Sequence, residues 1–214
     1  MRKIKTVIIG LGRIGFEYSK TTKNYSYFDN LKRLKNVSLV GVCDSKINNL
    51  KAFNKLKILF YKDYKKMINE LKVDLVIISS SDETHYEIAL YCIKKKIKYL
   101  ITEKPITNSL YELKKLDKMV RSNKINFEIN YSRQFISFFL ILKKRLKYDF
   151  SNIIDINISF NNGLLHNGCH YLILLFYLFG QKNISVVYSN LTPSKIIKKD
   201  FCGKIILKIK KKFL

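Results

Sequence analysis

GLGRIG at residues 10–15 is the clearest indication of the fold of this 214-residue chain. It has the spacing G-x-G-x-x-G, follows a short apolar run and precedes a helical pattern, and in that context the motif predicts a dinucleotide site. Gly10 would make the tight turn, Gly12 would let the backbone approach a pyrophosphate, and Gly15 would let the helix pack close to the strand. The chain has only eight glycines, so three in this spacing form a specific signal.

The same motif calls for an acidic partner, and Asp44 ends the second apolar run, SLVGVCD. Its carboxylate is placed to accept hydrogen bonds from ribose hydroxyls, although an Asp at a strand end can also serve only as a helix cap. The gap from Gly15 is longer than the roughly 20 residues usual here, which predicts an insertion around residues 21–30. An acid disfavours a 2′-phosphate, so we expect NAD, while Lys46 leaves NADP open. The predicted cofactor residues of the loop are Gly10, Gly12, Arg13, Ile14 and Gly15.

The composition bounds the class of protein. The chain carries 41 Lys+Arg against 16 Asp+Glu, a net charge of +25, and 47% of its residues are hydrophobic. That apolar content excludes a disordered basic tail. Only six of the basic residues are Arg, and nucleic-acid readers favour Arg for its planar fork. We therefore expect no nucleic-acid partner.

The cysteines and the apolar runs indicate the compartment. Cys43, Cys92, Cys169 and Cys202 are far apart and form no C-x-x-C pair, so neither a zinc knuckle nor a redox motif is expected. The N-terminus has no signal-peptide pattern. The most apolar stretch, residues 171–179, is about half the ~20 residues that a membrane span needs. We expect a reduced, cytoplasmic protein without a membrane partner.

Hydrophobic periodicity predicts two domains. In residues 1–125, short apolar runs alternate with amphipathic helical patterns, which is typical of βαβ units around a parallel sheet. The expected strands are residues 5–9, 38–43, 58–61, 74–79 and 98–102. The fold class is therefore α/β, with an N-terminal Rossmann-type parallel sheet.

A different pattern begins beyond that sheet, in residues 126–214. Residues 135–147 and 171–179 read as helices, residues 154–160 alternate strictly as a half-buried strand does, and residues 185–188 and 204–209 are strand-like. The pattern predicts a partial α+β domain with an antiparallel sheet.

Two stretches follow strands of the predicted parallel sheet and carry candidate chemistry. Ligands of such sheets bind beyond the carboxyl ends of the strands, where ITEKPI places Glu103 and Lys104. Pro105 at this corner allows a cis bond that would fix the direction of Lys104. In SSSDETHYE, Ser80 is expected at the cofactor crevice. His85 either lines that crevice or lies in the first turn of a helix.

Two of the three histidines, His166 and His170, occur in LLHNGCHY. With Cys169 between them they allow a zinc reading, but the spacing is short and no fourth ligand is apparent, so we expect no metal. A histidine beside a bound hydroxyl can move the proton that accompanies hydride transfer. It can also simply begin the apolar helix that follows.

Taken in this order, GLGRIG, Asp44, SDETHYE, EKP and GLLHNGCHYLILLFYLFG resemble the glucose–fructose oxidoreductase/inositol dehydrogenase family (Gfo/Idh/MocA). The resemblance covers residues 5–180 and implies a Rossmann domain, an open antiparallel sheet domain and nicotinamide bound between them. By the same resemblance Lys104 holds the reacting hydroxyl, His170 is the catalytic histidine, and His166 and Asn167 face the substrate. The wording of the histidine motif is closest to members that modify sugars or nucleotide sugars for surface polysaccharides.

The sequence departs from the family pattern in two ways. Positions that carry acids in many members are His166 and Ile173 here, which implies an altered acid–base network. The family's second domain is also longer than residues 126–214, which implies a truncated or split chain. We therefore expect an NAD(P)-dependent oxidoreductase acting on a sugar-like substrate, with a homo-oligomer through the C-terminal sheet as one expectation. The alternative is a dinucleotide-binding protein without turnover that acts through a partner.

Overall fold

The computed structural model describes residues 2–17, 25–46, 53, 55–149, 156–197 and 199–210, without the side chains of residues 147–149. The chain divides into two compact units, Met1–Asn130 and Tyr131–Leu214. Each unit is described by itself.

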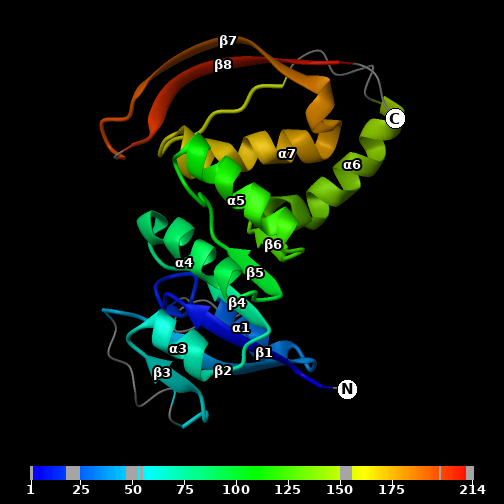
Figure 1. The fold of residues 1–214 in the computed structure, drawn as a ribbon. Coiled ribbons are helices and arrows are strands. Elements are labelled where there is room, and N and C mark those ends of the chain that lie inside the picture. Colours follow the sequence, from blue (N-terminus) through cyan, green and yellow to red (C-terminus); the bar gives the residue numbers. More distant parts are fainter. Residues whose placement is uncertain are drawn as a thin grey trace. The chain divides into compact units, whose positions relative to one another are not determined.

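The first unit is built on a six-stranded parallel sheet of order β3-β2-β1-β4-β5-β6 (Figure 1). The chain builds one half of the sheet first and then crosses over, so β1 and β4 are neighbours at the centre. The carboxyl ends of strands meet there, at the place where such sheets bind ligands. The strands are β1 Ile4–Ile9, β2 Val37–Cys43, β3 Leu59–Tyr61, β4 Leu75–Ile78, β5 Tyr99–Thr102 and β6 Asn126–Ile129.

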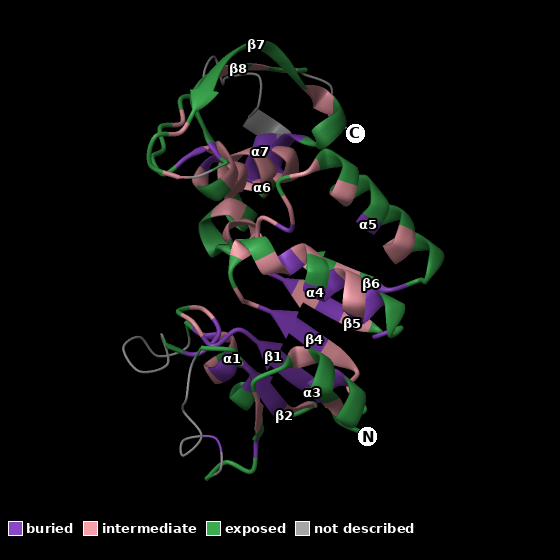
Figure 2. Cartoon of the chain, turned by 60° about the vertical axis from the view of Figure 1, so that its left-hand side comes forward, coloured by how far each residue is buried: buried purple, intermediate pink, exposed green. Residues whose placement is uncertain are grey.

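Helices cover both faces of this sheet because its central strands are apolar on both sides. Val7 and Ile9 of β1 pack in one core cluster with α3, α4 and α5, while Ile8 packs in the other with α1. Figure 2 shows the central strands of the sheet as buried. Each fully buried side chain of this kind contributes about 1.5–3 kcal/mol. The helices are α1 Tyr27–Arg33, α3 Tyr64–Glu70, α4 Asp82–Lys94 and α5 Leu110–Ser122.

All five strands expected in this unit are present, with ends that shift by one residue. The sixth strand, β6, pairs in parallel with β5 although it lies beyond the boundary expected at residue 125. Its burial pattern alternates between exposed and half-buried residues. It lacks the continuous apolar run that identifies a central strand.

The second unit has one apolar helix against a two-stranded antiparallel ribbon. Leu174, Leu175, Leu178 and Phe179 of α7 form its small core with Leu146 of α6. Strands β7 and β8 pair along their whole length and stay mostly exposed. The elements are η2 Ser132–Phe135, α6 Ser137–Asp149, the π-helical turn η4 Leu164–Gly168, α7 Cys169–Phe179, η5 Gln181–Asn183, β7 Ile184–Pro193 and β8 Phe201–Ile209.

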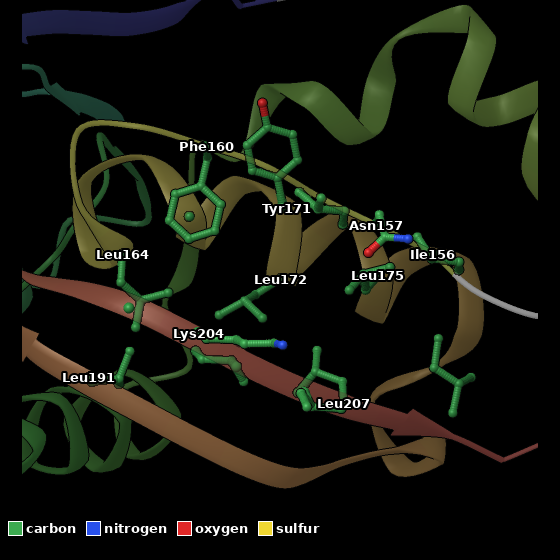
Figure 3. A pocket seen from close by; sticks show the side chains of 16 residues that line it. Ile156, Asn157, Phe160, Leu164, Tyr171, Leu172, Leu175, Leu191, Lys204 and Leu207 are labelled. Atoms are coloured by element: carbon green, nitrogen blue, oxygen red, sulfur yellow. The ribbon is translucent and has the colours of Figure 1, made fainter.

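The prediction of a strand at residues 154–160 is wrong for the part that the structure describes. Residues 156–160 are not in a strand, and residues 154 and 155 lie outside the described residues. A groove of about 620 Å³, with Leu172 and Leu175 of α7 in its wall, separates the segment from β8 (Figure 3). Alternation sets which side chains share a face, but a strand also needs a neighbour for its backbone hydrogen bonds.

Within the described residues, no helix is both long and apolar enough to span a membrane.

Candidate active site

The glycine-rich loop follows β1 and is shaped by close backbone contacts. The Gly10 amide donates to the carbonyl of Cys43 at 2.8 Å, which ties the loop to the end of β2. Gly10 has a φ of +95°, and an added Cβ would lie 2.3 Å from the backbone nitrogen of Ser80. A Cβ on Gly15 would lie 2.1 Å from the Gly10 carbonyl oxygen. Both glycines are therefore required by the turn itself.

Gly12 differs from its two neighbours in the motif. A Cβ added there would meet nothing within 4 Å in the described part of the chain. The packing of the protein does not demand glycine at this position, but a ligand approaching the backbone would. Beside it, Arg13 is exposed and Ile14 is half-buried. The loop thus fits a pyrophosphate, as the motif predicts.

Asp44 lies at the end of β2 and holds the loop. Its Oδ2 accepts from the Leu11 amide and its Oδ1 from the Lys46 amide, both at 2.8 Å. A carboxylate oxygen has two lone pairs, and Asp44 is only half-buried. The side chain therefore shapes the loop, and its half-buried carboxylate is placed where a ribose hydroxyl could donate to it.

The sequence leaves two positions open for His85, the cofactor crevice and the first turn of a helix, and the structure has it in the helix. It lies in the first turn of α4 and is fully buried. Its Nδ1 is 2.8 Å from the carbonyl oxygen of Pro105, and its Nε2 is 3.0 Å from the carbonyl oxygen of Ser80. The imidazole therefore connects two loops at the carboxyl ends of β4 and β5 and does not line the crevice. The Ser80 hydroxyl is 2.7 Å from that of Thr84.

Glu103 and Lys104 follow β5, as the sequence predicts. Glu103 Oε1 accepts from the Tyr27 hydroxyl at 2.8 Å and from Asn130 Nδ2 at 2.7 Å, so it joins α1 to the end of β6. Burial raises the pKa of Tyr27, and the Glu103 carboxylate adds to the effect. Lys104 is half-buried, and its bond to Pro105 is cis, which the sequence allows.

The predicted catalytic histidines lie in the second unit, on the turn that begins at Gly163 and leads through η4 into α7. His166 is exposed, whereas Asn167 and His170 are half-buried. The Asn167 side chain accepts from Arg133 Nη2 at 3.2 Å and donates to the Asn161 carbonyl at 2.9 Å. This fixes its amide group in one orientation.

Sequence reasoning missed three residues that surround this turn. The ring of Tyr131 is edge-on to His170 with centroids 6.2 Å apart, and burial raises the pKa of Tyr131 to about 12. The Arg133 guanidinium lies over the Tyr171 ring at 4.7 Å. Asp200 is 4% exposed and accepts hydrogen bonds from the backbone of the turn. The stretch NYSRQF, a polar and aromatic run right after the last parallel strand, was the available signal for the first two.

The predicted residues therefore fall into two groups. The glycine loop, Asp44, Ser80, Glu103 and Lys104 gather at the carboxyl ends of strands in the first unit. His166 and Asn167 lie in η4 of the second unit, and His170 lies directly after it in the first turn of α7. No group of three or more His, Cys, Asp or Glu residues that could hold a metal occurs among the residues that the structure describes.

Comparison with known proteins identifies relatives of both units. The model of a family described as an oxidoreductase family with an NAD-binding Rossmann fold matches residues 4–131. The chain is 28% identical over 142 residues to myo-inositol 2-dehydrogenase of Thermotoga maritima, a match covering 65% of this chain and 40% of that protein. It is 29% identical over 176 residues to inositol 2-dehydrogenase of Salmonella typhimurium, covering 78% and 46% respectively. The aligned part thus spans less than half of these curated relatives.

Solved structures show the same fold. A myo-inositol 2-dehydrogenase from Lactobacillus plantarum superposes with a TM-score of 0.71 at 21% identity, covering 91% of this chain and 61% of that one. The WlbA dehydrogenase from Chromobacterium violaceum, solved with NADH and UDP-GlcNAcA, superposes with a TM-score of 0.71 at 16% identity, covering 94% and 61%.

Proposed function

Because the chain belongs to the Gfo/Idh/MocA family of oxidoreductases with an NAD-binding Rossmann fold, we propose that it exchanges hydride between NAD and a hydroxyl of a sugar-like substrate. The observation that carries the proposal is the glycine loop. Among the described residues it leaves open space at Gly12, and it presents the half-buried carboxylate of Asp44 beside it. The loop binds the pyrophosphate through its backbone amides, and Asp44 accepts from the ribose.

The nicotinamide, when bound, supplies the redox chemistry, and the protein supplies orientation and proton handling. Lys104 at the end of β5 donates a hydrogen bond to the substrate hydroxyl. His170 takes the hydroxyl proton during oxidation and returns it during reduction. Asn167 orients a neighbouring substrate hydroxyl, since its amide is held by Arg133 and Asn161. His166 is exposed on the same segment, four residues before His170.

The relatives support the proposed substrate class. The two curated relatives described above are inositol dehydrogenases, and one neighbouring structure was solved with a nucleotide sugar. A polyhydroxylated ring is common to both, and the positive net charge of this chain would attract an anionic cofactor and a phosphorylated or nucleotide-linked sugar. A role in surface-polysaccharide biosynthesis rests on the sequence resemblance. A cytoplasmic location rests on the four free cysteines.

A second candidate function is the binding of NAD without turnover, with the chain acting through a partner. The exposed apolar side chains Val186, Val187 and Tyr188 of β7 offer a surface for such a partner or for a second copy of the chain.

Titration with NADH, followed by turnover assays on inositols, sugars and nucleotide sugars, tests the proposal. Lys104→Ala is expected to lower kcat/KM by at least about 100-fold while NADH affinity is retained, because the lysine acts on the substrate. Lys72→Ala, which removes an exposed lysine of the same unit, is the matched control. Full activity of Lys104→Ala would refute the assignment. NADH binding without turnover of any substrate would favour the second candidate.

A further inference from the structure

Asp200 is a buried carboxylate that the proposed reaction does not use. It directly precedes β8 and is 4% exposed. Its Oδ1 accepts from the amides of Leu165 at 2.8 Å and Phe201 at 2.6 Å, and its Oδ2 accepts from the amide of His166 at 2.9 Å. Its own carbonyl accepts from the Ser194 amide at 2.7 Å. One side chain thus joins the β7–β8 ribbon to the turn that carries the histidines.

Gly163 lies against this carboxylate, although the two residues are 37 positions apart in the sequence. It has a φ of +78°, and an added Cβ would lie 2.1 Å from Oδ2 of Asp200. Only glycine lets the chain turn here and still leaves room for the carboxylate against the next amides. The geometry of the turn therefore depends on both residues.

The position of the carboxylate also suits its charge. The first amides of a helical segment lack partners within the helix and carry a partial positive charge. Leu165 and His166 supply such amides at the start of the helical run formed by η4 and α7. Burial raises the pKa of Asp200, but the backbone hydrogen bonds from Leu165, Phe201 and His166 outweigh it and hold the pKa below its usual range. The group is charged at neutral pH.

We propose that Asp200 is the positioning residue of the catalytic turn, which it holds so that Asn167 and His170 face the substrate. The proposal rests on the proposed function for the roles of those two residues. Asp200 acts through the backbone of Leu165 and His166, immediately before Asn167 in the chain. Arg133 and Asn161 hold the Asn167 side-chain amide through two further hydrogen bonds, so a shift of the turn would break an arrangement that several partners define.

The test compares Asp200→Asn and Asp200→Ala with the unaltered chain. Asn keeps one acceptor oxygen but replaces the other with a donor that opposes an amide, whereas Ala removes both. We expect kcat to fall by about 10- to 100-fold, since small misplacements of a catalytic group cost this much, with NADH affinity unchanged. The loss should be larger for Ala, and the pH profile of kcat should shift because the environment of His170 changes.

Histidine NMR gives a readout that does not need turnover. The chain has three histidines, and His85 is buried in the first unit as an internal reference. In both Asp200 variants the ring signals of His166 and His170 should move, while those of His85 should not. Asp63→Asn is the matched control, because Asp63 caps α3 of the first unit through the Lys65 amide at 2.8 Å. It should leave the three histidine signals, kcat and NADH affinity unchanged.

The two proposals fail in different ways. If the unaltered chain turns over no substrate, the proposed function fails, but the signals of His166 and His170 still show whether Asp200 sets the turn. If Asp200→Asn keeps these signals and the amide exchange of Leu165 and His166, the positioning role is refuted. A normal kcat and pH profile in an active Asp200→Asn variant would refute it as well.

Discussion

The loop at residues 10–15 and the turn at residues 163–168 begin alike, each with a glycine at positive φ and an aspartate from another element bound to its amides. The two carboxylates differ in what they have left to offer. Asp44 is half-buried and accepts one amide on each oxygen. Asp200 is almost fully buried and accepts three amides. A glycine at positive φ paired with an aspartate therefore suits ligand binding where the carboxylate is accessible, and supports the turn where the carboxylate is buried.

The largest expected effect is on stability, and it should differ between Gly10 and Gly163. Gly10→Ala should lower the free energy of unfolding by about 3 kcal/mol or more, because the strain of a positive φ costs about 1–3 kcal/mol and overlap with rigid backbone at Ser80 adds to it. Gly163→Ala should cost less, since its Cβ would meet the side chain of Asp200 and not rigid backbone. Urea denaturation measures both.

A double variant shows whether Asp200 causes the strain at the second glycine. Gly163→Ala combined with Asp200→Ala should cost less than the sum of the single changes, because removal of the carboxylate relieves the overlap. Strict additivity of the two costs would contradict the contact.

The second effect concerns the cofactor. Asp44→Ala should weaken NADH binding by roughly 10-fold or more, the value of a hydrogen bond to a charged group. Gly12→Ala should also weaken binding, because its Cβ would occupy space that the protein leaves open, and the free energy of unfolding should change little. Fluorescence titration of NADH measures the affinity. If Asp200→Ala lowered the NADH affinity as much as Asp44→Ala, the proposed difference between the two carboxylates, ligand binding and internal support, would be contradicted.

A smaller effect is expected in acid. Because the pKa of folded Asp200 is lowered, its contribution to stability is present above the pKa of about 3.9 in the unfolded chain. It is lost as the pH falls through the lower pKa of the folded state. Asp200→Asn should therefore lose less stability than the unaltered chain as the pH falls below about 4. Parallel acid profiles for the two proteins, followed by circular dichroism, would contradict the assignment.

The smallest effect concerns how deeply the cysteines are buried within each unit. Burial raises the pKa of both Cys43 and Cys92 in the first unit to about 12, with Asp44 adding to the shift at Cys43. Cys202 in β8 is exposed. A thiol reagent at pH 8 should label Cys202 first and reach Cys43 and Cys92 only on unfolding. Mass spectrometry of digested samples gives the order, and early labelling of Cys92 would contradict the packing of α4 against the sheet.

Sequence patterns predict the first unit well because its strands are apolar on both faces and its loop motif is local. Gly10, Gly12, Gly15 and Asp44 obey spacing rules that need no knowledge of tertiary contacts. The sequence does not reveal β6, because Asn126 and Glu128 interrupt its apolar character. It also cannot say that the alternation at residues 156–160 finds no strand partner, since that depends on distant residues.

Sequence patterns also fail to predict which polar side chains are buried. His85 in a helical turn looks the same in sequence whether it faces a crevice or connects two carbonyls. Asp200 stands among lysines in KKDF and gives no local sign that its carboxylate reaches the backbone of residues 165 and 166. Such roles arise from contacts across long sequence separations, which patterns within one segment do not encode.

The strand order of the parallel sheet has a consequence for synthesis. β2 and β3 add to one side of β1, after which β4, β5 and β6 add in turn to the other side. Every new strand thus joins an existing edge, and none must be inserted between two that have already paired. The sheet can be completed once residue 129 has emerged from the ribosome, so the nucleotide-binding unit can fold co-translationally before the histidine-bearing unit has been made.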